Sequence, residues 1–181
     1  MKALIPIAND VEDIETVCLI DVLRRADIHV NVSSVQEKTI TAARGTVITA
    51  DSLIHELSNQ QFDIIALPGG MPGAEYLRDS ALLDTMIKNQ ANSGKLLGAI
   101  CASPAIVLEP KGILKNMSAT CHPACSAPLG DRYNGKRVSV TKNIVTSQGP
   151  GTAIEFALKL IELVLGHSKT QEVINPMIIN N

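Results

Sequence analysis

The strongest candidate for a reactive side chain is Cys101, which directly follows the apolar run Leu96–Ile100. Two small residues, Ala102 and Ser103, and then Pro104 come after it. This order is typical of a nucleophile elbow, a sharp strand-to-helix turn that exposes the side chain at its tip. The N-terminus of the helix predicted to follow would favour the thiolate through its N–H groups and its partial positive charge. The alternative is a buried cysteine that acts only as a small hydrophobe.

Two adjacent glycines, Gly69 and Gly70, follow another apolar run, Ile64–Leu67. Glycine adopts backbone conformations that leave N–H groups unpaired, and such groups form oxyanion holes. If both apolar runs are parallel strands, Gly70 and Cys101 lie at the same edge of the sheet. An ordinary loop between a strand and a helix is the alternative.

Glu15 heads a helical stripe that is otherwise apolar, with Leu19, Val22 and Ala26 at positions i+4, i+7 and i+11. A carboxyl group in this position is expected to be partly buried. Desolvation and a nearby thiolate would both favour its protonated form. A protonated glutamic acid beside a thiolate donates a hydrogen bond and relays a proton during catalysis. The alternative is an exposed glutamate, the usual location for this residue type.

His122 is the histidine best placed by sequence to assist a cysteine nucleophile as a base or hydrogen-bond partner. Its neighbours Cys121 and Cys125 raise the alternative of a zinc site. A structural zinc ion needs four ligands, commonly from two short-spacing clusters, and the sequence has no second cluster. We therefore predict no metal site.

The elements that must position these residues alternate between strands and helices. Residues 3–8, Ile64–Leu67 and Leu96–Ile100 are almost entirely apolar, as strands covered on both faces are. Helices are predicted over residues 13–26, 80–92 and 152–165, with Gly166 as a stop, and a hairpin over residues 39–50. The fold class is therefore α/β, a doubly wound, mostly parallel sheet with helices on both faces.

Three further features bear on this organisation. Pro6 lies inside the first predicted strand, where its missing N–H has no evident explanation. Residues 121–135 are rich in proline, glycine and small polar residues and are predicted to be largely loop. No linker, repeat or low-complexity tract interrupts the chain, so we expect one domain over residues 1–181.

The composition excludes several classes of function. Hydrophobic residues make up 45% of the chain and charged residues 19%, a balance typical of globular proteins. Aromatic residues make up only 2% and the net charge is -2, so binding to nucleic-acid backbones is not expected. The phosphate-loop, dinucleotide-binding and serine-elbow motifs are all absent, so no nucleotide cofactor is expected.

The N-terminal apolar run is at the short limit for a signal peptide, and acidic residues follow it almost at once. No apolar run approaches the ~20 residues of a membrane span. We therefore expect a cytoplasmic protein without membrane association, whose four cysteines are free thiols.

Taken together, these motifs resemble those of the ThiJ/PfpI superfamily, in the branch of the parkinsonism-associated protein deglycase and bacterial YajL. The similarity covers essentially the full length, in order, and is carried by residues 11–17, 22–26, 64–70, 99–104, 122–123 and 146–153. Two features differ from the family pattern: Ser103 replaces a Gly or Ala, and thiols flank His122. These thiols leave open a second cysteine able to resolve an oxidised Cys101.

The resemblance implies a flavodoxin-like fold, a homodimer and no cofactor. It implies Cys101 as an oxidation-sensitive nucleophile, Glu15 as its protonated partner and His122 as the nearby histidine. Gly70 and Ala102 would supply backbone N–H groups. By the same matching, Arg25 and Arg44 would lie close to the site and the dimer interface, where they would stabilise an oxidised, anionic Cys101.

The family relationship implies two main functions. One is cofactor-free detoxification of small reactive aldehydes, as a glutathione-independent glyoxalase that converts methylglyoxal to lactate or as a deglycase of glycated proteins and nucleotides. The other is an oxidative-stress sensor and chaperone that acts through a Cys101 sulfinate with negligible turnover. A lesser alternative is a Cys-His amidohydrolase or peptidase, which would need a third group to orient His122.

Overall fold

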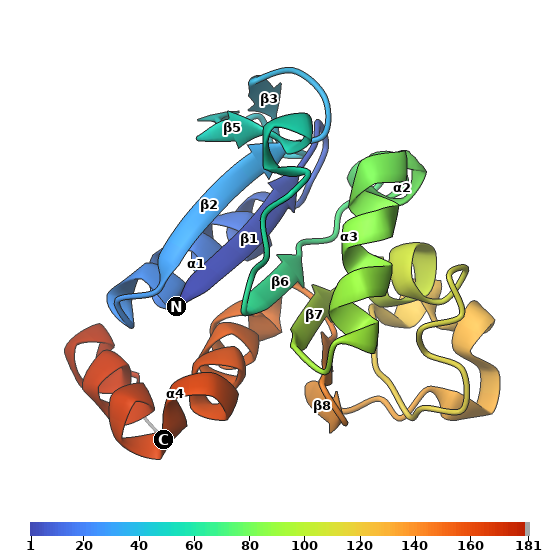
Figure 1. Cartoon of the computed structure of the whole chain (residues 1–181). Helices are drawn as coiled ribbons and strands as arrows, with labels where there is room; N and C mark the ends of the chain where they lie inside the picture. The colour runs from blue at the N-terminus through green and yellow to red at the C-terminus, as the bar shows by residue number, and fades with distance from the viewer. Residues whose placement is uncertain (180–181) are drawn as a thin grey trace.

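The computed structural model describes residues 1–179. Its main strands are β1 (Lys2–Ile7), β2 (His29–Ser34), β5 (Ser52–Leu53), β6 (Ile64–Leu67), β7 (Leu96–Ile100), β8 (Val138–Thr141) and β9 (Ile144–Ser147). They form one sheet in the order β5-β2-β1-β6-β7-β9-β8 (Figure 1). All neighbours in this sheet are parallel except β8 and β9. The predicted mostly parallel α/β fold is confirmed.

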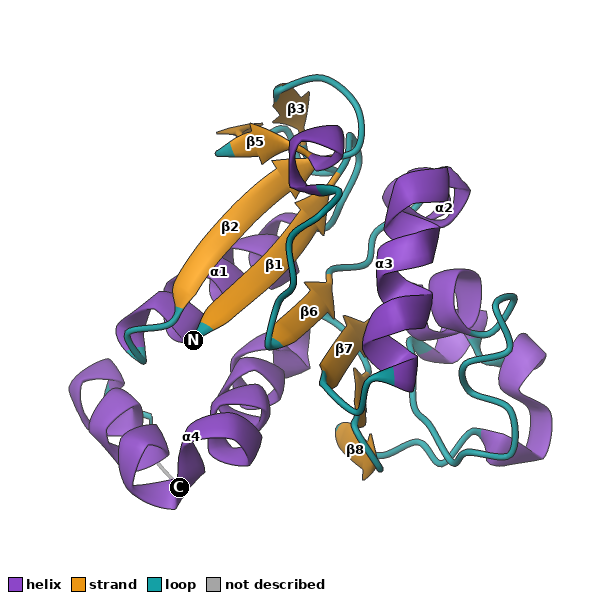
Figure 2. Ribbon diagram, in the orientation of Figure 1, coloured by secondary structure: helices purple, strands orange, loops and turns teal. Residues whose placement is uncertain are grey.

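Helices cover both faces of the sheet (Figure 2). They are α1 (Asp13–Arg25), α2 (Gly73–Asp79), α3 (Ala81–Asn92) and α4 (Ala153–Met177), with short helical turns between them. In Figure 1, α1 lies behind β1 and β2, whereas α3 passes in front of β7. Helix α1 also packs against α4.

The central strands are buried as their apolar sequences predict. Every residue of β6 and β7 is buried, and so is every residue of β1 after Lys2. A strand buried on both faces needs apolar residues at successive positions rather than at alternate ones. The predicted bounds of the β6 and β7 strands are confirmed without change.

Local signals also explain where helices begin. The Glu12 side chain caps α1 by accepting the Glu15 N–H at 2.8 Å, and Ser80 caps α3 through the N–H of Leu83. The hairpin predicted over residues 39–50 is present as the antiparallel strands β3 (Thr39–Thr41) and β4 (Val47–Thr49).

Pro6 is tolerated because it lies past the last hydrogen-bonded pair between β1 and β6, where a backbone N–H would have no partner on β6. Strand β1 pairs with β6 only through Ala3 and Leu4. The odd-numbered residues of β1 face β2, since the Ile7 carbonyl accepts from Val35 just past the end of β2. Pro6 therefore faces the β6 side, where pairing has stopped, and no hydrogen bond to β6 is lost.

Helix α4 is longer than predicted. Gly166 interrupts it with a φ of 83°, so the predicted stop is correct as a break in the helix. A second helical limb then continues to Met177, and Figure 1 shows the two limbs at an angle. This limb was missed because its sequence is mostly polar, and only Thr170 and Val173 are buried in it.

Two predictions, on the long loop and on membrane-spanning segments, are tested by the described residues. Residues 121–135 contain two short 3-10 turns, Pro123–Cys125 and Ala127–Arg132, and are otherwise loop as predicted. Within residues 1–179, no helix is both long and apolar enough to cross a bilayer.

Candidate active site

The predicted site residues gather at the carboxyl ends of four neighbouring strands. Glu15 is in the helix after β1, Gly69 and Gly70 follow β6, Cys101 follows β7, and Gly149 lies two residues beyond β9. Because β1, β6, β7 and β9 are adjacent and parallel, their ends meet at one edge of the sheet. This edge is where open α/β sheets bind ligands.

Cys101 sits on a strained turn whose backbone is fixed on both sides. Its φ is 62°, a left-handed conformation that non-glycine residues rarely adopt. Its N–H donates to the Ser147 carbonyl at 3.0 Å, and its carbonyl accepts the His122 N–H at 2.8 Å. The turn continues into a short π-helical segment, Pro104–Leu108, in place of the regular helix predicted there. Strain of this kind is typical of a nucleophile elbow.

The backbone N–H groups of Gly70 and Ala102 lie beside the Cys101 sulfur and lower the pKa of its thiol. Gly70 has a φ of 91°, and a Cβ at this position would lie 2.4 Å from the Asp10 carbonyl oxygen. Gly69 is equally constrained, because its Cβ would lie 2.6 Å from the Cys101 Cβ. Gly69 is therefore required by close packing against Cys101, and Gly70 by close packing against residues 10–12.

Glu15 is fully buried beside the sulfur. Its Oε2 accepts the Gly69 N–H at 2.8 Å, and its Oε1 is buried without a satisfied hydrogen bond to any described residue. Burial raises the pKa of Glu15 to about 7, although the Gly69 N–H and Cys101 act in the opposite direction. Glu15 therefore holds a proton far more readily than an exposed glutamate does.

The Cys101 thiol is buried more deeply than the sequence suggested. Burial, followed by the negative charge of Glu15, raises the pKa of Cys101 to about 12, against the lowering effect of the Gly70 and Ala102 N–H groups. The backbone N–H groups favour the thiolate, as predicted, but burial and the charge of an ionised Glu15 outweigh them. When Glu15 is protonated, its charge disappears and its O–H donates to the sulfur, so both effects reverse. The protonation of each residue therefore depends on that of the other.

His122 lies on the exposed side of the pair, in agreement with its predicted place. Its Nδ1 accepts the Ala124 N–H at 3.2 Å, which assigns the ring proton of the neutral form to Nε2. A Cβ built on Gly149 would lie 3.5 Å from His122 Cδ2 and 3.9 Å from Glu15 Oε1. Gly149 thus keeps open the space between the carboxyl group and the imidazole ring.

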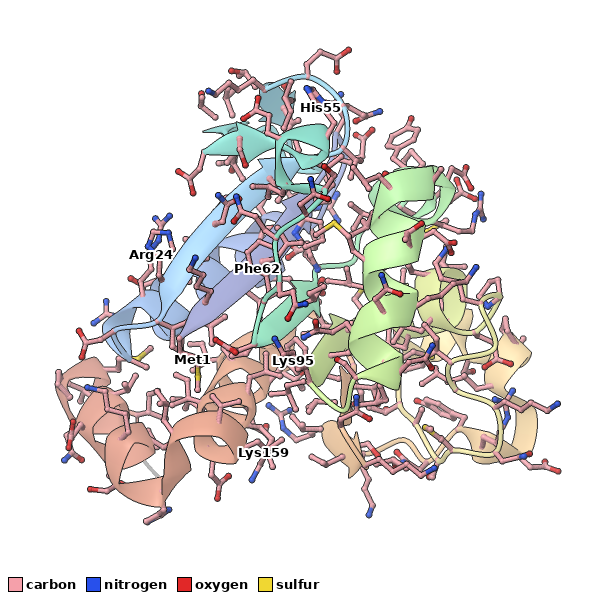
Figure 3. The ribbon with its side chains drawn as sticks, viewed as in Figure 1. Met1, Arg24, His55, Phe62, Lys95 and Lys159 are labelled. Atoms are coloured by element: carbon pink, nitrogen blue, oxygen red, sulfur yellow. The ribbon has the colours of Figure 1, made fainter. Side chains whose placement is uncertain are left out.

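Of the two arginines that the family resemblance places near the site, one lies at the far end of α1 and the other lies at the same end as Glu15. Arg25 pairs with Asp21 at the far end of α1, ten residues beyond Glu15, and Figure 3 shows its neighbour Arg24 beside β2. Within one chain, Arg25 is therefore at the opposite edge of the sheet from Cys101. Arg44 is at the same end of α1 as Glu15, because its backbone N–H donates to Asp13 at 2.8 Å, and its side chain is exposed.

Sequence reasoning missed two backbone contributions. The sequence indicates Gly69 only as a neighbour of Gly70, yet its N–H is the group that holds Glu15. It indicates no role for Gly149, which lies beside both Glu15 and His122. Nothing in the local sequence reports such contacts, since the strand order decides which loops become neighbours. For the described residues, no cluster of three or more His, Cys, Asp or Glu side chains is arranged to hold a metal ion.

The fold and the site define an α/β protein with a strained cysteine and a buried acid partner at the carboxyl edge of its sheet. Comparison with known proteins shows its relatives. A model of the DJ-1/PfpI family matches residues 1–163. A solved structure of oxidized Toxoplasma gondii DJ-1 is similar, with a TM-score of 0.97, 44% identity and 99% of each chain covered.

Similarity to curated proteins indicates the same family. Protein DJ-1 homolog B of Arabidopsis thaliana is 44% identical over 93% of this chain, which spans only 39% of that relative. The glutathione-independent glyoxalase DJR-1.2 of Caenorhabditis elegans is 36% identical over 93% of this chain and 91% of its own length. The chain belongs to the DJ-1/PfpI family, and the resemblance seen in the sequence is confirmed.

Proposed function

We propose that the chain is a cofactor-free enzyme that converts methylglyoxal to lactate without glutathione. The observation that carries this proposal is the fully buried Glu15 carboxyl group beside a cysteine held on a strained turn. Similarity to a nematode relative named as a glutathione-independent glyoxalase supports the reaction class.

The first step joins the sulfur to the substrate. Cys101 adds to the aldehyde carbon C1, and the aldehyde oxygen takes the proton from Glu15, which gives a hemithioacetal. The N–H groups of Gly70 and Ala102, beside the sulfur, stabilise the negative charge that develops on this oxygen. Glu15 is left as a carboxylate, ready to act as a base.

The next steps move hydrogen between the two carbons. Glu15 removes the hydrogen of C1 as a proton, and the electron pair moves to the ketone oxygen to form an enediolate. His122, neutral with its proton on Nε2, transfers the C1 hydroxyl proton to that oxygen, a role suited to neutral histidine in enediolate chemistry. Glu15 returns its proton to C2, leaving a lactoyl thioester. Water hydrolyses the thioester, which releases lactate and restores the thiol.

Lactate formation by purified, reduced protein without glutathione tests this mechanism. We expect turnover to be lost in Cys101→Ala and Glu15→Gln and kept in Cys18→Ser, a half-buried thiol on α1 that the mechanism does not use. Undiminished lactate from either of the first two variants would overturn the mechanism. The same steps on an aldehyde already attached to an amine or thiol would make the chain a deglycase, and the same variants test that extension.

A second function, an oxidative-stress sensor or chaperone, is favoured by the solved relative described as oxidized. In this function, Cys101 is oxidised to a sulfinate that Glu15 stabilises by donating a hydrogen bond. Absence of turnover, together with selective gain of two oxygen atoms on Cys101, would favour this function. A hydrolase is less well supported, because Nδ1 of His122 is oriented by a backbone N–H rather than by a carboxylate.

We also propose that the chain forms a homodimer through the face that α1 and α4 share. Ile14 is 54% exposed and Ile154 is 38% exposed, and both line a groove between these helices. Support of an anionic Cys101 by Arg25 would require a second copy, given its place in one chain. Sedimentation of Ile154→Glu should give monomers, whereas Leu163→Glu, an exposed α4 site outside the groove, should leave the dimer intact.

A further inference from the structure

Two cysteines that the proposed reaction does not use make contact with the same oxygen atom, one through its sulfur and one through its backbone N–H. Cys121 Sγ donates to the His122 carbonyl oxygen at 3.4 Å. The backbone N–H of Cys125 donates to that same oxygen at 2.8 Å. The bond from the Cys125 N–H closes a turn, so that both cysteines lie against the same carbonyl group.

One of the two thiols is fixed and the other is not. Cys121 is fully buried, and the residue before it is tied to β9 by the bond from the Thr120 N–H to Thr146 Oγ1 at 2.9 Å. Cys125 is only half-buried and ends the short turn Pro123–Cys125, none of whose residues is buried. Cys125 is therefore the partner that is free to approach.

The two thiols are close enough for the charge of one to affect the pKa of the other. Burial raises the pKa of Cys121 to about 12, and the nearby Cys125 contributes to this rise. Burial also raises the pKa of Cys125, which is the more exposed of the two. Cys125 is accordingly the better placed of the two to meet an oxidant from solvent.

We propose that Cys121 and Cys125 form a reversible disulfide that regulates His122, an inference whose regulatory part rests on the proposed function. The oxidant is a hydroperoxide. The Cys125 sulfur attacks the peroxide oxygen to give a sulfenic acid and release water or an alcohol. Cys121 then attacks that sulfur, which forms the S–S bond and releases water. In total, two thiols lose two hydrogen atoms and one hydroperoxide is reduced.

The disulfide acts on the site because His122 belongs to the turn that joins the two cysteines. Oxidation removes the S–H that donates to the His122 carbonyl and ties the Cys125 sulfur to the fixed Cys121, with the Cα atoms held about 4.4–6.8 Å apart. The Ala124 N–H that orients His122 Nδ1 belongs to the same turn. Closing the ring therefore changes the direction of the imidazole while Cys101 itself stays reduced.

Tryptic peptides separate this reaction from oxidation of the other thiols. Residues 116–132 carry Cys121 and Cys125 together, residues 96–111 carry Cys101, and residues 3–24 carry Cys18. After mild hydrogen peroxide and blocking of free thiols, we expect peptide 116–132 to be two hydrogen atoms lighter and unblocked, and reduction to restore blocking. This product should form in wild type, Cys101→Ala and Cys18→Ser, and be absent from Cys125→Ser.

Two results would overturn the disulfide. One is a peptide 116–132 that stays fully blocked after Cys101 has been oxidised. The other is a cross-link between peptides 116–132 and 96–111, which would make Cys121 a resolving thiol for Cys101 instead.

The regulatory part is measured on the same samples. While peptide 96–111 is unmodified, disulfide formation should lower kcat about a hundredfold, the low end of what one proton-transfer group contributes. Reduction should restore kcat, and Cys125→Ser should keep it throughout. Full activity of the disulfide form would refute regulation. A reduced protein with no turnover would refute the proposed function and leave the disulfide result standing.

Discussion

The buried Glu15 carboxyl group makes a prediction about folding stability that does not depend on any substrate. Its pKa is raised from an ordinary 4.5 to about 7, with burial as the largest cause. A raised folded-state pKa means that the folded protein binds the proton more tightly than the unfolded chain does. The stabilisation is fully present below about pH 4.5 and is lost as the pH rises through about 7.

The size of the effect follows from the shift. At about 1.4 kcal/mol per pKa unit, ionisation of Glu15 costs about 3 kcal/mol of folding stability. Glu15→Gln keeps an oxygen that accepts the Gly69 N–H and an N–H₂ group that replaces the acid proton, but it cannot ionise. We therefore expect the variant to be about 3 kcal/mol more stable than wild type at pH 8, a rise in Tm of roughly 5–10 °C, and equally stable near pH 4.5.

Urea unfolding between pH 4.5 and pH 9 measures this difference. Glu56→Gln is the matched control, since Glu56 is exposed and makes no ion pair with another described residue. The difference should persist in a Cys101→Ala background, because burial does not depend on the sulfur. A constant difference between wild type and Glu15→Gln across this pH range would refute the reasoning, and so would equal stability at pH 8.

Three other substitutions test the geometry around the site by chemical denaturation. Gly70→Ala should prevent correct folding. Gly45→Ala, at a similar φ of 93° but with nothing within 4 Å of its added Cβ, should lower the unfolding free energy by only about 1–2 kcal/mol. Equal effects of the two substitutions would contradict the close packing at Gly70. Cys101→Gly should raise the unfolding free energy by about 1 kcal/mol while abolishing turnover, since its φ of 62° suits glycine; a less stable variant would argue against strain. Gly98→Ala should cost about 1–3 kcal/mol, because its Cβ would lie 2.8 Å from the Phe156 ring; Phe156→Leu should make that added cost smaller, and an unchanged cost would point to another cause.

The sequence predicts the helices and strands of this fold more accurately than it predicts which residues become neighbours in space. The runs Ile64–Leu67 and Leu96–Ile100 are strands with those bounds, because burial on both faces leaves a continuous apolar signal. The position of Cys101 on a strained turn also followed from small residues after a strand. The single-domain organisation and the cytoplasmic location stay predictions.

What the sequence could not supply is the result of tertiary contacts. The degree of burial at Cys101 depends on the loops of three other strands, so the opposing effects on its pKa were not visible from its own segment. The donation from Gly69 to Glu15 joins residues 54 positions apart. The second limb of α4 has too few buried residues to produce a helical apolar pattern.

The coupling between Glu15 and Cys101 also connects the enzymatic function with the sensor function. A sulfinate on Cys101 is a permanent anion beside Glu15, and a nearby negative charge raises the pKa of a carboxyl group further. Oxidation would therefore consume the nucleophile and also hold Glu15 in its acid form, so that one molecule cannot perform both functions at once. In protein whose Cys101 carries two added oxygens, the loss of stability expected between about pH 4.5 and 7 should extend above pH 7. The same urea series measures it, and an unchanged pH profile after oxidation would show that the sulfinate and Glu15 are not coupled.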